Sequence, residues 1–211
     1  MTPETLTTLG KSDRVMGALI KRVGPCGLTP ERKRSPYESL VRAVAHQQLT
    51  GKAAQTILGR FLALFPGKRK FPLPEEIAAR TDEELRGVGF SRAKVAAIRD
   101  IAAKTLEGVV PTSRQIAKLS DDEIVDRLIQ VRGVGRWTVE MLLIFQLGRP
   151  DVLPVHDYGV QNGFRLAYRL ESLPKPRQLE EFGQRWRPYR TTAAWYLWRA
   201  VDLAKLAAGK S

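Results

Sequence analysis

The sequence has few of the features that define several classes of protein. Its 211 residues include one cysteine, Cys26, so an internal disulfide, a four-cysteine zinc site and a four-cysteine iron–sulfur cluster are excluded within this chain. We expect Cys26 to be a buried thiol. No apolar run approaches the roughly 20 residues needed to cross a bilayer. The first ten residues lack the basic start and apolar centre of a secretion signal, so we expect an intracellular protein of the cytoplasm, nucleoid or nucleus.

Negative charge is scarce. The chain carries 22 Asp and Glu against 35 Lys and Arg, a formal net charge of +13. This balance favours a polyanionic partner, and nucleic acid fits better than a membrane surface because no segment is apolar enough to insert. The alternative is a basic protein whose charge serves only solubility. We interpret the basic stretches 32–34 and 68–70 as solvated surface.

Sustained two-residue alternation of apolar and polar side chains is also missing. Apolar residues instead recur every three or four positions, which predicts an all-α fold. Two segments fit the capping box, in which a hydroxyl and a carboxylate bond each other's backbone amides at a helix start: Thr81 with Glu84, and Ser120 with Glu123. Ser91 and Thr112 are further predicted helix caps.

Two similar glycine turns each separate a short predicted helix from a longer one. They are Leu85-Arg-Gly-Val-Gly89 and Val131-Arg-Gly-Val-Gly135. A unit of helix, hairpin and helix is therefore predicted twice. Only the second turn continues into Arg136-Trp137-Thr138. We interpret the first as a structural relative, and chance similarity of two ordinary turns is the alternative.

The second hairpin has the composition of a phosphate grip. Val134 is expected to plug the core between two helices, while Gly133 and Gly135 adopt positive φ and admit another backbone. The next helix is predicted to begin at about Arg136, with unpaired amides at the positive end of its dipole. Arg136 adds charge and Thr138 a hydroxyl at that end. Tight packing between two helices would explain the glycines equally well.

A single carboxylate follows this hairpin at a defined distance. Asp157 lies 157 − 135 = 22 residues after Gly135, in Leu-Pro-Val-His-Asp-Tyr. Because it follows a proline turn, one interpretation is that it only caps the next helix.

Together these motifs resemble the helix-hairpin-helix (HhH-GPD) superfamily of base-excision DNA glycosylases. The resemblance is closest to its alkylation-repair branch, the DNA-3-methyladenine glycosylase II type. It rests on 131–138 and 154–158, and extends to 41–49 and 185–198. We expect two departures from the family: Arg132 stands where members often have Pro, and no counterpart of the N-terminal β-domain of the larger bacterial enzyme is expected.

The resemblance implies two helical subdomains flanking a DNA-binding cleft. We expect one subdomain over 37–149, carrying the helix-hairpin-helix, and a second built from 1–36 and 150–211. A single-lesion enzyme needs no symmetry, so we expect a monomer that acts on double-stranded DNA.

The resemblance also implies a reaction. Asp157 would stabilise the positive charge that grows on the sugar as the N-glycosidic bond breaks, or would activate water. Lyase-competent relatives carry a Lys where this chain has Trp137, so a monofunctional glycosylase is expected. The alternatives are a non-catalytic helix-hairpin-helix DNA-binding module and a bifunctional glycosylase/lyase. No redox or organic cofactor is expected.

The resemblance places Trp137, Met141 and Trp198 in the base pocket. Indole faces attract the positively charged ring of an alkylated purine, so N3-methyladenine and N7-methylguanine are the expected lesions. Core packing is the alternative for Trp198, which is three residues from Trp195 and could share its helix face, and for Met141, where the bacterial relative carries Tyr.

Base flipping leaves a gap in the duplex that a protein side chain must fill. The segment Gln47-Gln48-Leu49 resembles the family's wedge, with Gln48 at the inserting position. Without the resemblance it would be an ordinary helix terminus. The family also implies that backbone carbonyls near Ile129, Val131 and Val134 hold one monovalent cation, Na⁺ or K⁺.

Overall fold

The computed structural model describes residues 2–67 and 70–208, and these ranges contain helices and no β-strand. The prediction of an all-α fold is confirmed. No helix within these ranges is long and apolar enough to cross a membrane. Residues 68 and 69 of the predicted basic stretch lie outside the described part of the chain.

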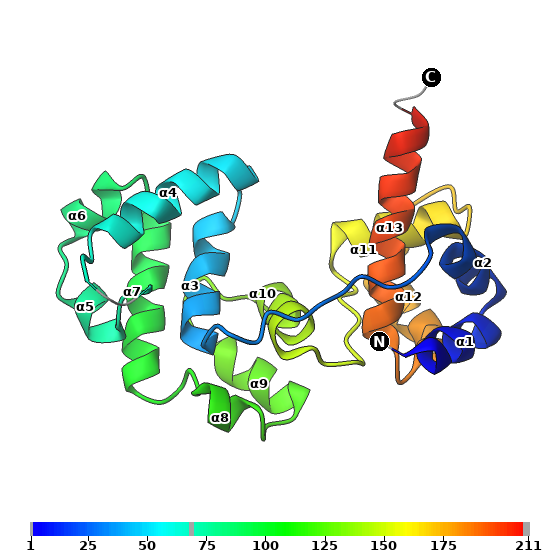
Figure 1. Ribbon diagram of the computed structural model, residues 1–211, viewed down its shortest axis with the longest axis horizontal. Coiled ribbons are helices and arrows are strands. Elements are labelled where there is room, and N and C mark those ends of the chain that lie inside the picture. The colour runs from blue at the N-terminus through cyan, green and yellow to red at the C-terminus, as the bar shows by residue number, and fades with distance from the viewer. Residues whose placement is uncertain (1, 68–69, 209–211) are drawn as a thin grey trace. The chain divides into compact units, whose positions relative to one another are not determined.

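The chain forms two compact units, shown in Figure 1. The terminal unit comprises Met1–Pro30 and Leu143–Ser211, and the central unit comprises Glu31–Leu142. The first segment of the chain thus packs with the last one. The boundaries expected from the sequence, at 37 and 149, lie a few residues further along the chain.

The terminal unit is built around its last helix. Its elements are α1 (Pro3–Ser12), α2 (Arg14–Val23), the π-helix η1 (Leu143–Leu147), α11 (Tyr158–Ala167), α12 (Pro176–Gly183), the 3₁₀ turn η2 (Gln184–Trp186) and α13 (Arg190–Ala208). Helix α13 packs on α11 and α2 (Figure 1). The closest approach is at Gly163, where a Cβ atom would lie 2.0 Å from the Leu197 carbonyl oxygen.

Asp13 ties the N-terminal helices to this core. It caps α2 and is buried, and its carboxylate accepts hydrogen bonds from Tyr168 and, at 3.1 Å, from the Trp186 indole. Burial and the Asp13 carboxylate both raise the pKa of Tyr168. Trp186 is therefore a core residue. Cys26 is only partly buried, so the expectation of a buried thiol is wrong.

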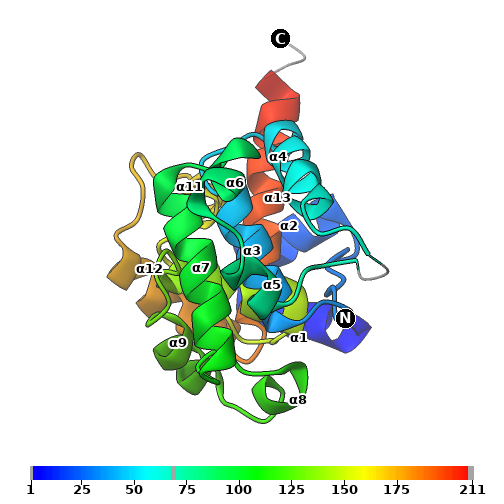
Figure 2. The same ribbon diagram turned by 90° about the vertical axis from the view of Figure 1, so that its left-hand side faces the viewer.

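The central unit surrounds a long helix. Its elements are α3 (Pro36–His46), α4 (Gly51–Ala63), α5 (Pro74–Ala78), α6 (Asp82–Gly87), α7 (Arg92–Leu106), α8 (Ser113–Ile116), α9 (Asp121–Leu128) and α10 (Arg136–Leu142). Helix α7 packs against α3, α5 and α6. Figure 2 shows α7 with these helices in view. The structure confirms both predicted capping boxes, at Thr81 and Ser120, and the caps Ser91 and Thr112.

Candidate active site

Asp157 stands at the N-terminus of α11. Its backbone is extended, and its Oδ1 atom accepts a hydrogen bond from the Val160 amide at 2.7 Å. Its own amide donates to the Pro154 carbonyl at 2.9 Å. The carboxylate therefore caps the helix, as one interpretation of the sequence held. Capping uses Oδ1 and is compatible with chemistry at the same carboxylate.

A second donor reaches the same oxygen. The Trp198 indole N–H lies 2.8 Å from Asp157 Oδ1. A side chain at position 159 would obstruct this arrangement, because a Cβ on Gly159 would lie 2.8 Å from Trp198 Cδ1 and 3.0 Å from Asp157 Oδ1. Glycine at 159 thus lets the indole lie against the start of α11 and orient the carboxylate.

Phe145 is the site residue that sequence reasoning missed. Its ring stacks on Trp198, with the centroids 5.5 Å apart and the planes 25° from parallel. It is 41% exposed although it lies in the apolar run 142–145. The π-helical turn over Leu143–Leu147 alters which side chains share a face, and no sequence signal marks that change. Tyr158, which follows the carboxylate, is 68% exposed.

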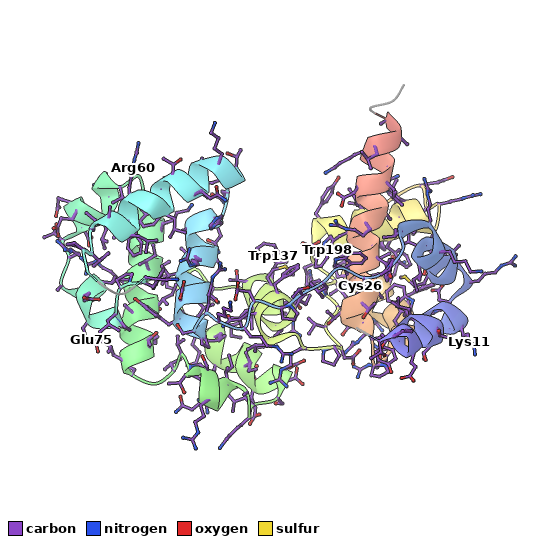
Figure 3. All side chains as sticks on the ribbon, viewed as in Figure 1. Lys11, Cys26, Arg60, Glu75, Trp137 and Trp198 are labelled. Carbon is purple, nitrogen blue, oxygen red and sulfur yellow. The ribbon has the colours of Figure 1, made fainter. Side chains whose placement is uncertain are left out.

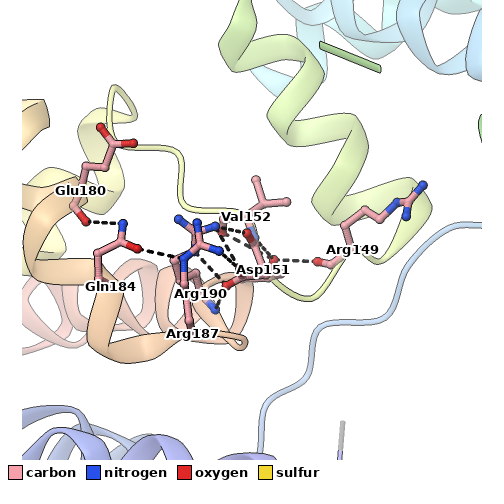
Figure 4. Close-up of polar contacts among 8 residues, drawn as sticks. Arg149, Asp151, Val152, Glu180, Gln184, Arg187 and Arg190 are labelled. Carbon is pink, nitrogen blue, oxygen red and sulfur yellow. Dashed lines mark hydrogen bonds and ion pairs between the residues drawn. The ribbon is translucent and has the colours of Figure 1, made fainter. Parts of the chain in front are cut away.

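The segment that precedes Asp157, residues 149–152, is hydrogen-bonded to the start of α13, as Figure 4 shows. Arg190 donates to both oxygens of Asp151, at 2.8 and 3.0 Å. The Thr191 hydroxyl accepts from the Val152 amide at 2.9 Å and donates to the Arg149 carbonyl at 2.6 Å. Because α13 also carries Trp198, these contacts fix the segment that leads to Asp157 relative to the helix that orients it.

The predicted hairpin joins α9 to α10 in the central unit. Gly133 has φ 76°, and a Cβ there would lie 2.8 Å from Ala97 Cβ. Val134 is 4% exposed, which confirms its expected place in the core. The expectation of positive φ at Gly135 is wrong, because only Gly133 of the pair adopts it. A Cβ on Gly135 would meet nothing within 4 Å, so that position faces open space.

Helix α10 begins at Arg136, as predicted. The Arg136 side chain is 60% exposed and pairs with Glu140 at 3.2 Å. Thr138 differs from its predicted role. It is 4% exposed, so its side chain packs inside the unit and does not present a hydroxyl at the surface beside Arg136.

Trp137 and Met141 lie one turn apart on α10. Trp137 is 45% exposed, an unusual state for an indole, and Met141 is partly buried. Figure 3 labels Trp137, on the central unit, and Trp198, on the terminal unit. Trp137 is therefore accessible to a ligand within its own unit.

The predicted wedge segment follows α3. The Gln47 side-chain amide donates to the Gly133 carbonyl at 3.1 Å, so it is engaged with the hairpin. Gln48 is exposed and has φ 58°, a left-handed backbone that is uncommon for a residue other than glycine. Leu49 is 39% exposed. The two exposed side chains are thus Gln48 and Leu49.

A family model described as "HhH-GPD superfamily base excision DNA repair protein" matches residues 41–188. This range includes the wedge segment, the hairpin and Asp157, and it covers more than half of the chain. The chain belongs to this superfamily. The resemblance inferred from the motifs is therefore confirmed.

Several relatives of this HhH-GPD chain are alkylation-repair proteins by name. The DNA-3-methyladenine glycosylase 1 of Schizosaccharomyces pombe is 44% identical over 189 residues, which is 88% of this chain and 82% of the relative. The alkylbase DNA glycosidase-like protein mag2 of the same organism is 37% identical over 195 residues, 92% of each chain. These relatives support the alkylation-repair branch.

A solved structure agrees with the HhH-GPD fold over nearly the whole chain. The 3-methyladenine DNA glycosylase of Schizosaccharomyces pombe, in complex with abasic DNA, has a TM-score of 0.83 and 41% identity, covering 93% of this chain and 95% of that one. In the described part of this chain, no group of three or more His, Cys, Asp or Glu side chains is arranged to hold a metal ion.

Proposed function

We propose that this protein is a monofunctional DNA glycosylase of base-excision repair that hydrolyses the N-glycosidic bond of alkylated bases in double-stranded DNA. The observation that carries the proposal is the Asp157 carboxylate, whose Oδ1 accepts hydrogen bonds from the Val160 amide and the Trp198 indole, which stacks on Phe145. N3-methyladenine and N7-methylguanine are its proposed substrates, and its place of action is the compartment that holds the cell's DNA.

The reaction is a substitution at the anomeric carbon. The carbon–nitrogen bond to the base breaks, and its electron pair neutralises the positive charge of the alkylated ring. The Asp157 carboxylate stabilises the positive charge that develops on the sugar. Water then forms the new carbon–oxygen bond, and its proton passes to the carboxylate or to solvent. The products are a free base and an abasic site, and no redox or organic cofactor takes part.

The residues proposed to recognise the base are Trp137 and Met141 in the central unit, and Trp198 with its stacking partner Phe145 in the terminal unit. An aromatic face attracts a cationic ring by roughly 0.5–2 kcal/mol. The thioether of Met141 is polarizable and adapts to ring shape. Because a neutral purine lacks the charge, these aromatic side chains favour alkylated bases over ordinary ones.

The proposed grip on duplex DNA uses the hairpin at Gly133 and Gly135 and the first turn of α10. The open space at Gly135 and the exposed guanidinium of Arg136 suit a phosphate backbone. Thr138 would contribute its backbone only. In the wedge segment Gln48 is the proposed inserting side chain, with Leu49 beside it and Gln47 anchoring the turn.

The hairpin also offers carbonyl oxygens to a monovalent cation. The Val131 carbonyl accepts a hydrogen bond from the Val134 amide at 3.0 Å and retains a second lone pair that is available to an ion. Na⁺ or K⁺ would be held by the carbonyls of Ile129, Val131 and Val134, and would stabilise the turn that presents the hairpin amides.

Release of methylated bases tests this function directly. Duplex DNA treated with a methylating agent is incubated with the protein, and the released bases are separated by chromatography. We expect N3-methyladenine and N7-methylguanine in the supernatant and intact strands until alkali is added. Protein that binds the duplex but releases no alkylated base would instead be a DNA-binding module.

Borohydride reduction should trap no covalent adduct between the protein and DNA. A Schiff base needs an amine at the sugar, and the residue after Arg136 is an indole. The measurement is denaturing electrophoresis of protein incubated with labelled lesion-bearing DNA and borohydride. A shifted band that depends on borohydride would mean a bifunctional glycosylase/lyase.

Trp198→Phe should lower the rate of base release about ten-fold, because phenylalanine keeps an aromatic ring beside Phe145 but loses the hydrogen bond to a charged acceptor. The measurement is single-turnover excision from a duplex with one N7-methylguanine. Trp195→Phe is the matched control on the same helix and should leave the rate unchanged. Equal rates for both variants would remove the indole N–H from the mechanism.

A further inference from the structure

One face of helix α7 contacts the hairpin and the last turn of α3, which leads into the wedge segment 47–49. Lys94, Ala97 and Asp100 are spaced by three residues, so they lie along the same side of the helix. Ala97 and Asp100 contact the hairpin, and Lys94 contacts the last turn of α3. The first glycine turn, Leu85–Gly89, precedes this helix.

Two of these residues hold the hairpin. The Asp100 carboxylate accepts the Arg132 amide at 2.7 Å. Ala97 is buried beneath Gly133, and a methyl group at 133 would lie 2.8 Å from Ala97 Cβ. One contact is a charge-assisted hydrogen bond and the other is close packing. Together these two contacts fix where the hairpin lies on α7 and how close it is to the helix.

The third residue holds the end of the helix that precedes the wedge. The Lys94 ammonium donates to the Ala45 carbonyl at 2.9 Å, in the last turn of α3. Lys94 is partly buried, and this burial lowers the pKa of its ammonium group. The cation also faces the negative end of the α3 dipole.

Gln47 links the two segments that α7 contacts, the end of α3 and the hairpin. Its amide donates to the Gly133 carbonyl at 3.1 Å and so joins the wedge turn to the hairpin, across 86 positions of sequence. The hairpin is thus held both by α7 and by Gln47. All the groups held in this way are backbone atoms.

We propose that α7 is a strut that keeps the hairpin and the wedge turn at a fixed separation, with Lys94 and Asp100 as positioning residues for base flipping. This inference rests on the proposed glycosylase function. Extruding a base requires one element to grip the backbone while another enters the stack. If the two elements moved independently, part of the binding energy would be lost in their relative motion.

Two duplexes separate positioning from folding. Both carry one N7-methylguanine, paired with cytosine in the first and placed opposite an abasic site in the second, where the base is already unpaired. Asp100→Ala and Lys94→Met should each lower single-turnover excision from the paired duplex about five- to ten-fold. On the unpaired duplex the rate should stay within about two-fold of wild type, because less work is needed for extrusion.

Conservative variants and a charge control complete the test. Asp100→Asn retains an oxygen acceptor and Lys94→Arg retains a donor, so both should recover most of the paired-duplex rate. Glu83→Ala removes an exposed carboxylate of the same unit and should behave as wild type. A 2-aminopurine placed next to the lesion should unstack less with Asp100→Ala and with Lys94→Met than with wild type. The other variants should unstack it as wild type does.

The strut is refuted if both positioning variants lose activity equally on the two duplexes, or lose none on either. It is also refuted if Asp100→Asn is as slow as Asp100→Ala. Wild-type protein that releases base from neither duplex would refute the proposed function itself, which separates that failure from the failure of the strut.

Discussion

Asp157→Asn is expected to lower single-turnover release of N7-methylguanine from duplex DNA by at least about a hundred-fold, the range seen when a group that stabilises transition-state charge is removed. Asparagine is nearly isosteric and caps helices as well as aspartate does. The Val160 amide would keep an acceptor, and so would the Trp198 indole. What is lost is the negative charge that opposes the developing charge on the sugar.

Binding and charge controls make this result specific. The variant should bind a duplex with a stable abasic-site analogue as tightly as wild type, measured by fluorescence anisotropy. Glu171→Gln removes an exposed carboxylate of the same unit and should leave base release unchanged. If Asp157→Asn released bases at the wild-type rate, another group would have to supply the chemistry.

The parts of the fold that could be predicted from sequence depend on residues close together in the chain. Thr81 bonds Glu84 and Ser120 bonds Glu123, each within one turn, so a short motif contains all the information. The hairpin is similar, because Val134 must be apolar wherever two helices meet in that way. The helical repeat of apolar residues indicates an all-α chain for the same reason.

The parts that could not be predicted depend on distant contacts. Gln47 and Gly133 are 86 positions apart, so no local pattern links the wedge to the hairpin. Gly135 has the residue type of a left-handed position but an ordinary backbone, because glycine permits positive φ without requiring it. Thr138 has the polarity of a surface residue, but its place on α10 turns it inward.

The contact between Phe145 and Trp198 illustrates the same limit at the active site. Leu142-Leu143-Ile144-Phe145 reads as continuous core, and three of these four side chains are buried as that pattern predicts. A π-helical turn, which has no clear sequence signature, accompanies the exposure of the fourth. The family resemblance identified Trp198, but only the structure reveals that its indole N–H donates a hydrogen bond to Asp157.

Gly163→Ala is expected to destabilise the terminal unit by about 3 kcal/mol or more, at the upper end of the cost of overpacking. The new methyl carbon would lie 2.0 Å from the Leu197 carbonyl oxygen, which belongs to a helix backbone and cannot rotate away. Helices α11 and α13 would have to separate. Because α11 begins at Asp157 and α13 carries Trp198, base release should fall together with stability.

Gly59→Ala is the matched control, since Gly59 also lies inside a helix, α4, but a Cβ there would meet nothing within 4 Å. It should stabilise the protein by up to about 1 kcal/mol, because alanine is the better helix former. The measurement is urea unfolding followed by tryptophan fluorescence and circular dichroism. If the two variants shifted the unfolding midpoint in the same direction, close packing of α11 against α13 would not explain the glycine at 163. Opposite shifts, with activity lost only at 163, would establish that this helix contact supports the carboxylate site.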